Sequence, residues 1–272
     1  MEAGDGWRCG QGSTHGPVGA RGERDDTDKV LEALHNPDTG TVVQVAPAVR
    51  AAWGEQFGLP PEVATEKRLA TILRHMGVEY VFDTNFAADL TIMEEGTEFI
   101  ERFTHPGSAP MPMFTSCCPG WMRFVKTQAP ELLGNISTCK SPQQMFGALT
   151  KTYYAQKMGL DPHDIVCVSV MPCTAKKYEI QRPELSSLDG VPDVDAVLTT
   201  RELARMIKSA GIDLRALPEG TFDAPLGLST GAAGIFGVTG GVTEAVIRPL
   251  PAAARPNTLQ THAECGRRGP AG

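Results

Sequence analysis

Strand-like and helix-like segments alternate along most of this 272-residue chain. The strand-like segments are short and nearly continuous in apolar residues, as in strands that are buried on both faces. The segments between them repeat apolar residues at helical spacing. This order predicts right-handed crossovers and an α/β fold in which helices cover parallel sheets. The expected strands are residues 41–45, 78–82, 112–115, 164–170 and 194–198, and the expected helices are residues 27–34, 48–57, 69–76, 85–103, 120–128, 142–158, 175–180 and 201–210, the last capped by Thr200.

The composition restricts the classes of protein to which the chain can belong. Its net charge of −7 argues against a nucleic-acid-binding surface. No apolar run approaches the roughly 18 residues of a membrane span, and the first residues lack the apolar segment of a secretory signal. The seven cysteines are an odd number in a large chain, which argues against a disulfide framework and favours metal ligands or buried free thiols.

Two short motifs place thiols where an α/β fold carries its chemistry. Thr-Ser-Cys-Cys-Pro-Gly-Trp (115–121) and Met-Pro-Cys-Thr-Ala-Lys-Lys-Tyr-Glu (171–179) each follow a predicted strand and lead into a predicted helix. Thiolates in such positions suit soft metals, above all iron–sulfur clusters. Buried thiols that pack as small apolar side chains are the alternative, and the chemistry of the residues leaves the two interpretations about equal.

The two motifs resemble the catalytic domain of iron-only (FeFe) hydrogenases. The resemblance extends from about residue 42 to about residue 248 and includes further blocks in the same order. It implies a two-lobed α/β catalytic domain, and the absence of a preceding ferredoxin-like cysteine cluster is similar to the short algal type. The further blocks are residues 43–50, 82–95, 140–144 and 241–245.

The resemblance implies a composite iron cofactor, the H-cluster. Cys118 and Cys173 correspond to ligands of its four-iron cluster, which is joined to a diiron site that carries CO and cyanide. Lys176, one helical turn beyond Cys173, corresponds to the lysine that holds a cyanide, because an ammonium offsets the charge of that ligand and donates a strong hydrogen bond. A solvated surface lysine is the alternative interpretation of Lys176.

The resemblance also implies a route for protons. Cys117 corresponds to a free thiol that donates a proton to the diiron site, with simple packing as the alternative. Glu95, Glu98 and Glu179 correspond to relay carboxylates, although exposed helical glutamates are common. Ser137 and Arg102 assist this relay in the family. The positions that line the diiron pocket, each equally plausible as plain core, are Ala46, Pro47, Met171, Gln143 and Phe236.

The chain departs from the family pattern after its second motif. A four-iron cluster takes four protein ligands, and the family supplies two of them from a late Cys-x-x-x-Cys block that is absent here. Cys265 is the one cysteine after Cys173, and its surroundings do not match. We therefore expect a weakly ordered lead-in (1–40), a catalytic-domain segment (41–248) with an incomplete second lobe, an irregular tail (249–272), and a chain that does not hold the whole cofactor.

These expectations define the predicted function and two alternatives. The prediction is reversible reduction of protons to dihydrogen by a ferredoxin-dependent monomer, loaded by hydrogenase maturation proteins, in the cytoplasm or chloroplast stroma. One alternative is a non-catalytic iron–sulfur relative of the narf-like type. The other is an inactive fragment that arises from truncation, a wrongly predicted splice or a frameshift. The remaining cysteines are expected to be structural (Cys139 and Cys167) or to lie in irregular ends (Cys9 and Cys265).

Overall fold

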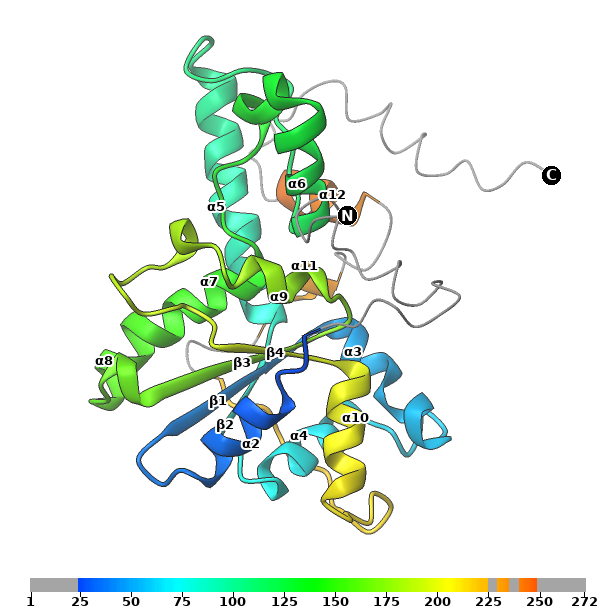
Figure 1. Cartoon of the computed structure of the whole chain (residues 1–272). Helices are drawn as coiled ribbons and strands as arrows, with labels where there is room; N and C mark the ends of the chain where they lie inside the picture. The colour runs from blue at the N-terminus through cyan, green and yellow to red at the C-terminus, as the bar shows by residue number, and fades with distance from the viewer. Residues whose placement is uncertain (1–23, 225–228, 235–239, 249–272) are drawn as a thin grey trace, which may run out of the picture.

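A four-stranded parallel sheet forms the centre of the computed structural model, which describes residues 24–224, 229–234 and 240–248 (Figure 1). The strands follow the order β2-β1-β3-β4, and every pairing is parallel, which confirms the predicted α/β architecture. Val43 of β1 lies opposite Val81 of β2 on one side and Val168 of β3 on the other. The strands are β1 (Gly40–Val45), β2 (Tyr80–Asp83), β3 (Ile165–Met171) and β4 (Ala196–Thr199).

Helices cover both faces of this sheet. Helices α2, α4 and α10 lie together on one side, whereas α7 and α8 lie on the other, and the long helix α5 rises from the sheet towards α6 and α12 (Figure 1). The helices described are α2 (Thr27–His35), α3 (Pro47–Ala52), α4 (Glu66–His75), α5 (Asn85–Thr104), α6 (Pro119–Gln128), α7 (Pro142–Leu149), α8 (Ala155–Met158), α9 (Ala175–Glu179), α10 (Thr200–Ser209), α11 (Gly231–Gly234) and α12 (Gly241–Ile247), with 3-10 turns at Trp53–Phe57, Pro130–Asn135, Pro162–Asp164 and Pro183–Leu185 and a π turn at Thr150–Tyr154.

The apolar strands account for the core. β1 is buried from Thr41 to Val45, and β4 is buried along its whole length. This burial is expected for strands covered on both faces. One polar side chain, that of Gln44, is fully buried in β1. It is satisfied because its Nε2 donates to the Gln143 carbonyl at 3.0 Å and its Oε1 accepts from Thr84 Oγ1 at 3.2 Å. This pair of bonds ties the sheet to the first turn of α7.

The strand order places the second thiol motif, which follows β3, at one edge of the sheet. The chain turns in opposite directions from β1 and from β3, so the crevice between their carboxyl ends is the topological switch point. The amide of Ala46 donates to the Val170 carbonyl at 3.0 Å, which continues the β1–β3 pairing to this edge. Residues that follow β1 and β3 therefore lie beside each other, although the sequence separates them widely.

Three sequence predictions require correction. The predicted strand at 112–115 is a single bridge between Phe114 and Ile136, because Pro110 and Pro112 have no N–H with which to form a ladder. The helix after β4 is capped by Thr199 rather than Thr200. Glu202 lies three residues beyond Thr199 and completes a capping box with it.

The predicted helix at 142–158 is interrupted by a π turn between α7 and α8. Residues 24–35 belong to the expected lead-in, in which the sequence predicted a short helix at 27–34, and this helix is confirmed. They include α2, whose Val30 and Ala33 are buried against the sheet. The apolar spacing of this helix is sufficient to hold it on the domain.

Candidate metal and proton-transfer site

The three thiols of the two motifs lie at the ends of short helices. Cys118 is the N-cap residue of α6, and Pro119 occupies the first helical position, where its missing N–H costs nothing. Cys117 and Cys118 are both exposed, whereas Cys173, which follows β3 and precedes α9, is half-buried. Burial raises the pKa of Cys173, and the neighbouring Cys118 adds to the increase, so the two thiols are close enough to interact electrostatically.

Lys176 joins the two thiol segments. Its ammonium donates to the Cys117 carbonyl oxygen at 2.6 Å and lies 3.0 Å from Glu179 Oε2. The side chain is about nine-tenths buried, so it is not the solvated surface lysine that was the alternative. The ammonium thus links α9 to the backbone of the Cys117–Cys118 loop.

Glu179 gathers donors from two elements. Its Oε2 accepts from Ser141 Oγ at 2.9 Å and from Gln143 Nε2 at 3.0 Å, in addition to the Lys176 ion pair. Ser141 is also the N-cap of α7 and accepts from the Gln144 amide. Ser141 and Gln44 were not among the predicted site residues. The Ser-Pro-Gln-Gln sequence, which has the form of a helix start, was the available signal for Ser141.

Glu98 occupies a second cluster, on α5. Its carboxylate accepts from Arg102 Nη2 at 2.6 Å, from Ser137 Oγ at 2.7 Å and from the Thr138 amide at 3.1 Å. Burial would raise the pKa of Glu98, but these donors outweigh it and hold the pKa below its ordinary value. Glu98 thus contacts Ser137 and Arg102 directly, whereas the role of the three residues in proton transfer stays a prediction.

Arg102 fixes this cluster in place. The side chain is buried, and its guanidinium also donates to four backbone carbonyl groups. The planar group thus connects α5 with the turn before Ser137, and its charge compensates that of Glu98. The carbonyl groups that accept from Arg102 are those of Pro110, Gly134, Asn135 and Ile136.

Glu95 lies one turn before Glu98 in a different environment. It is buried, and its Oε2 has no hydrogen-bond partner among the described residues. Burial, with a smaller contribution from the charge of Glu98, raises the pKa of Glu95 to about 7. A carboxyl with this pKa exchanges protons readily near neutral pH, which suits the predicted relay position.

The segment 137–143 connects the two clusters. Ser137 and Cys139 contact Glu98, the latter with its sulfur 3.8 Å from Oε2, whereas Ser141 and Gln143 contact Glu179. Alternate residues of this segment therefore face the carboxylates in succession. Cys139, predicted to be structural, belongs to the Glu98 cluster, where burial raises its pKa to about 11.

The predicted pocket residues lie at the same carboxyl edge but differ in burial. Ala46, Met171 and Gln143 are buried, and Gln143 Oε1 has no partner among the described residues, whereas Pro47 is exposed. Cys167 is fully buried in β3, as predicted for a core residue. Phe236, Cys9 and Cys265 lie outside the described residues.

The donor set fits one side of a four-iron cluster. The Cys118 and Cys173 thiols are near enough to interact electrostatically, and a four-iron cluster takes four thiolate ligands. Within the ranges that the structure describes, no group of three or more histidine, cysteine, aspartate or glutamate side chains is arranged to hold a metal ion. Two thiols are half the number of protein ligands that such a cluster usually takes.

Comparison with known proteins identifies the family. The sequence model of the iron-only hydrogenase large subunit, C-terminal domain, matches residues 39–270. The chain belongs to this family. The match continues past residue 248, where the resemblance of individual motifs ended.

Iron-only hydrogenases are also among the similar individual proteins. The chain is 53% identical to the NADP-reducing hydrogenase subunit HndD of Solidesulfovibrio fructosivorans over 93% of its own length and 44% of that protein. A solved structure of apo [FeFe]-hydrogenase HydA1 from Chlamydomonas reinhardtii is 44% identical, with a TM-score of 0.74 over 86% of this chain and 61% of that one. The chain thus spans about half the length of these relatives.

A further relative has a name that does not indicate a hydrogenase. Protein NAR1 of Arabidopsis thaliana is 34% identical over 88% of this chain and 54% of that protein. The similar proteins therefore include some whose names do not mention a hydrogenase. None of the described helices is long and apolar enough to cross a lipid bilayer.

Proposed function

We propose that the chain is the H-cluster domain of an iron-only hydrogenase, which interconverts dihydrogen with protons and electrons supplied by ferredoxin. The observation that carries this proposal is the position of Lys176. A buried ammonium is held between Cys117 and Glu179, beside two thiols that are near enough to each other to interact electrostatically. Burying a lysine is costly unless an anion compensates it, and Glu179 together with an anionic ligand of the metal would do so.

The thiols of Cys118 and Cys173 would hold the four-iron cluster, and Lys176 would donate to an anionic ligand of the diiron site. When bound, the diiron site would supply the reducible metal at which protons and electrons combine. Cys117, exposed beside Cys118, would hold a proton at its sulfur atom. Glu95 would exchange protons near neutral pH, while Arg102 and Ser137 keep Glu98 ionised and oriented.

A second candidate is a non-catalytic iron–sulfur protein. In support, the Cys118 and Cys173 thiols are near enough to interact electrostatically, and the similarity to Protein NAR1 extends over most of the chain. Such a protein would hold a cluster at Cys118 and Cys173 without a diiron site. In that case Lys176 would serve only to join the thiol segments.

One experiment separates the two candidates. The full chain would be reconstituted anaerobically with iron and sulfide, treated with hydrogenase maturation proteins, and assayed for dihydrogen evolution with reduced ferredoxin. Hydrogen evolution that is lost in Lys176→Met, while the iron content and the paramagnetic resonance signal of the cluster persist, would support the hydrogenase. Lys126→Ala, which removes an exposed surface cation, is the control and should have no effect.

A stable cluster in the wild-type chain without hydrogen evolution would favour the second candidate. Absence of any cluster in the wild-type chain would contradict both. Cys173→Ser and Cys118→Ser should each reduce the iron content, whereas Cys167→Ser, in the core of β3, should retain it.

A further inference from the structure

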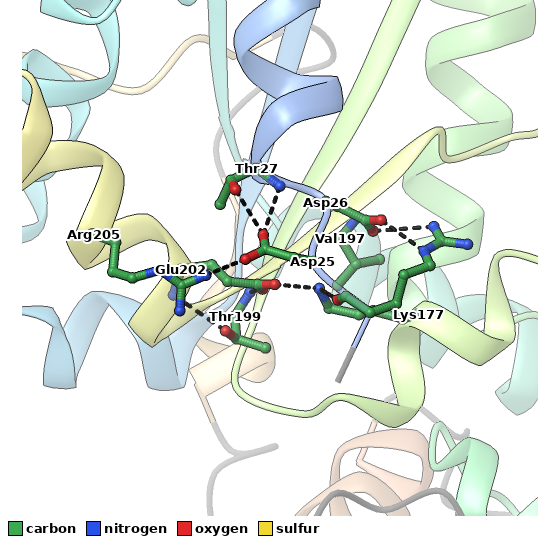
Figure 2. Close-up of polar contacts among 9 residues, drawn as sticks. Asp25, Asp26, Thr27, Lys177, Val197, Thr199, Glu202 and Arg205 are labelled. Carbon is green, nitrogen blue, oxygen red and sulfur yellow. Dashed lines mark hydrogen bonds and ion pairs between the residues drawn. The ribbon is translucent and has the colours of Figure 1, made fainter. Parts of the chain in front are cut away.

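A short segment before α2 crosses from the edge strand β4 to the helix that carries Lys176. Residues 24–27, here called the strap, lie beside β4, α9 and α10 (Figure 2). Asp26 is buried, and its Oδ2 accepts from the Val197 amide at 3.1 Å, on the side of β4 that faces away from β3. The strap therefore occupies the open edge of the sheet, where an unpaired amide would otherwise remain.

The strap is attached to α10 and is stiffened by contacts between its own residues. Arg24 Nε pairs with Asp26 Oδ1 at 2.7 Å, and Asp25 Oδ2 pairs with Arg205 of α10 at 2.5 Å. Asp25 Oδ1 also accepts from the amide and hydroxyl of Thr27, which begins α2 (Figure 2). These contacts fix the backbone of the strap as well as its side chains.

Lys177 connects the strap to α9. Its ammonium donates to the Arg24 carbonyl at 2.5 Å and lies 2.6 Å from Glu202 Oε1. Both side chains are at least 95% buried, so neither ion is solvated. Glu202 is held in turn, because its Oε2 accepts from the Thr199 amide at 2.6 Å (Figure 2).

Helix α9 depends on such contacts for its position. It has five residues, too few to be stable without tertiary interactions. Adjacent residues at its centre reach in two directions, since Lys176 contacts Cys117 and Glu179 whereas Lys177 contacts the strap and Glu202. Cys173 precedes the same helix by two residues.

We propose that Lys177 is a positioning residue, through which the strap and Glu202 hold α9 so that Cys173 and Lys176 face the Cys118 loop. Its importance for hydrogen chemistry depends on the proposed function, but the mechanical coupling does not. Loss of the strap should let α9 open locally while the central strands remain folded.

Hydrogen exchange of the full chain, without any cluster, tests this coupling. In Asp26→Ala, we expect exchange in the α9 peptide (172–181) to accelerate roughly tenfold, the change expected from the loss of about one net hydrogen bond. The β3 peptide (165–171) should change by less than about twofold. Asp26→Asn keeps an oxygen for the Val197 amide and should restore most of the protection.

The matched control is Lys29→Ala. Lys29 lies on α2 and donates to the Asp195 carbonyl at 2.8 Å, so it fastens the same end of the chain without contacting α9. It should leave exchange in α9 unchanged. Equal acceleration in α9 and β3 in Asp26→Ala, or equal effects of the Asp26 and Lys29 variants on α9, would overturn the proposal.

Lys177 is tested with its charge partner. Lys177→Met alone leaves the Glu202 carboxylate buried without a cation and is expected to unfold the chain, so Lys177→Met with Glu202→Gln is the informative variant. It should be folded, with the same tenfold acceleration confined to α9. Unchanged α9 exchange would refute the positioning role.

A second measurement relates the coupling to the metal site. After reconstitution with iron and sulfide, the double variant should show a changed paramagnetic resonance line shape of its cluster relative to wild type. An unchanged line shape would contradict a role in orienting Cys173. If wild type takes up no cluster, the proposed function fails, whereas the exchange result still decides the coupling.

Discussion

The thiol loops at the sheet edge and the carboxylates of α5 are built from opposite kinds of contact. Cys117 and Cys118 are exposed, and their hydrogen bonds with Lys176 and Ser116 are made by main-chain atoms. Glu98, by contrast, accepts from two side chains and an amide, and its guanidinium partner is buried. The loops present groups for an external ligand, whereas the carboxylate cluster is satisfied internally.

Within α5 the contrast recurs over a single turn. Glu98 is rich in donors and Glu95 has an oxygen without one. Since their helix and residue type are the same, the difference in pKa direction follows from the neighbours that the tertiary structure supplies. Adjacent turns of α5 thus carry Glu98, which stabilises the fold, and Glu95, whose raised pKa favours proton exchange near neutral pH.

The largest expected effect comes from removing the cation of the carboxylate cluster. Arg102→Ala leaves the Glu98 carboxylate without its partner and removes the donor of four carbonyl groups. We expect a loss of about 3–5 kcal/mol in the free energy of unfolding, measured with urea at pH 7. Lys126→Ala, which breaks an exposed pair, should cost no more than about 1 kcal/mol. Equal losses would show that the cluster is not internally stabilised.

Glu95 and Glu98 should give stability opposite dependences on pH. The folded pKa of Glu95 is about 7, above its ordinary 4.5, so its burial costs stability increasingly as the pH rises from 4.5 to 7. Glu95→Gln should remove this decline and add up to about 3 kcal/mol above pH 7. The lowered pKa of Glu98 means that its contribution is present above pH 4.5 and is lost as the pH falls through the folded value.

The measurement is the unfolding free energy between pH 4 and pH 8 for wild type, Glu95→Gln and Glu98→Gln. Glu98→Gln should lose stability mainly above pH 4.5, where wild type has the ionised group. If both variants changed the pH profile in the same direction, the two environments would not differ as the structure indicates.

Thiol reactivity should show a smaller but distinct contrast. Burial raises the pKa of Cys139 to about 11 from an ordinary 9.0, so its alkylation at pH 7 should be roughly 100-fold slower than that of free cysteine. Cys117 and Cys118 are exposed and should be modified first, and Cys167 should react only on unfolding. Timed iodoacetamide labelling with mass spectrometry would measure each site. Modification of Cys139 at the rate of Cys118 would contradict the difference in environment.

Much of the fold was predictable because it rests on local pattern. Residues of β1 and β3 carry long apolar runs, and helices such as α5 carry apolar residues at helical spacing, so their existence and parallel arrangement followed. The helix boundary at Thr199 was not predicted, because its capping partner Glu202 was not recognised in the sequence. The bridge at Phe114 was not predicted because its partner, Ile136, is distant in the sequence. The π turn within 142–158 likewise has no clear local signal.

The candidate site was predictable in part. Motif resemblance nominated Glu98, Ser137 and Arg102 together, and the structure brings their atoms into contact. Ser141 and Gln44 were missed because a serine at a helix start and a glutamine in a strand have common structural explanations. Only the folded chain shows that both lie in the hydrogen-bond network that leads to Glu179.

The sequence by itself determined the alternating elements, the family and the positions of the thiols just before helices, because these depend on residue type and spacing. The tertiary structure alone decided the electrostatics. Burial raises the pKa of Glu95, whereas donors on Ser137, Arg102 and Thr138 lower that of Glu98. Lys177 is anchored by residue 24 and by Glu202. Desolvation and hydrogen bonding act between groups that meet only when the chain has folded.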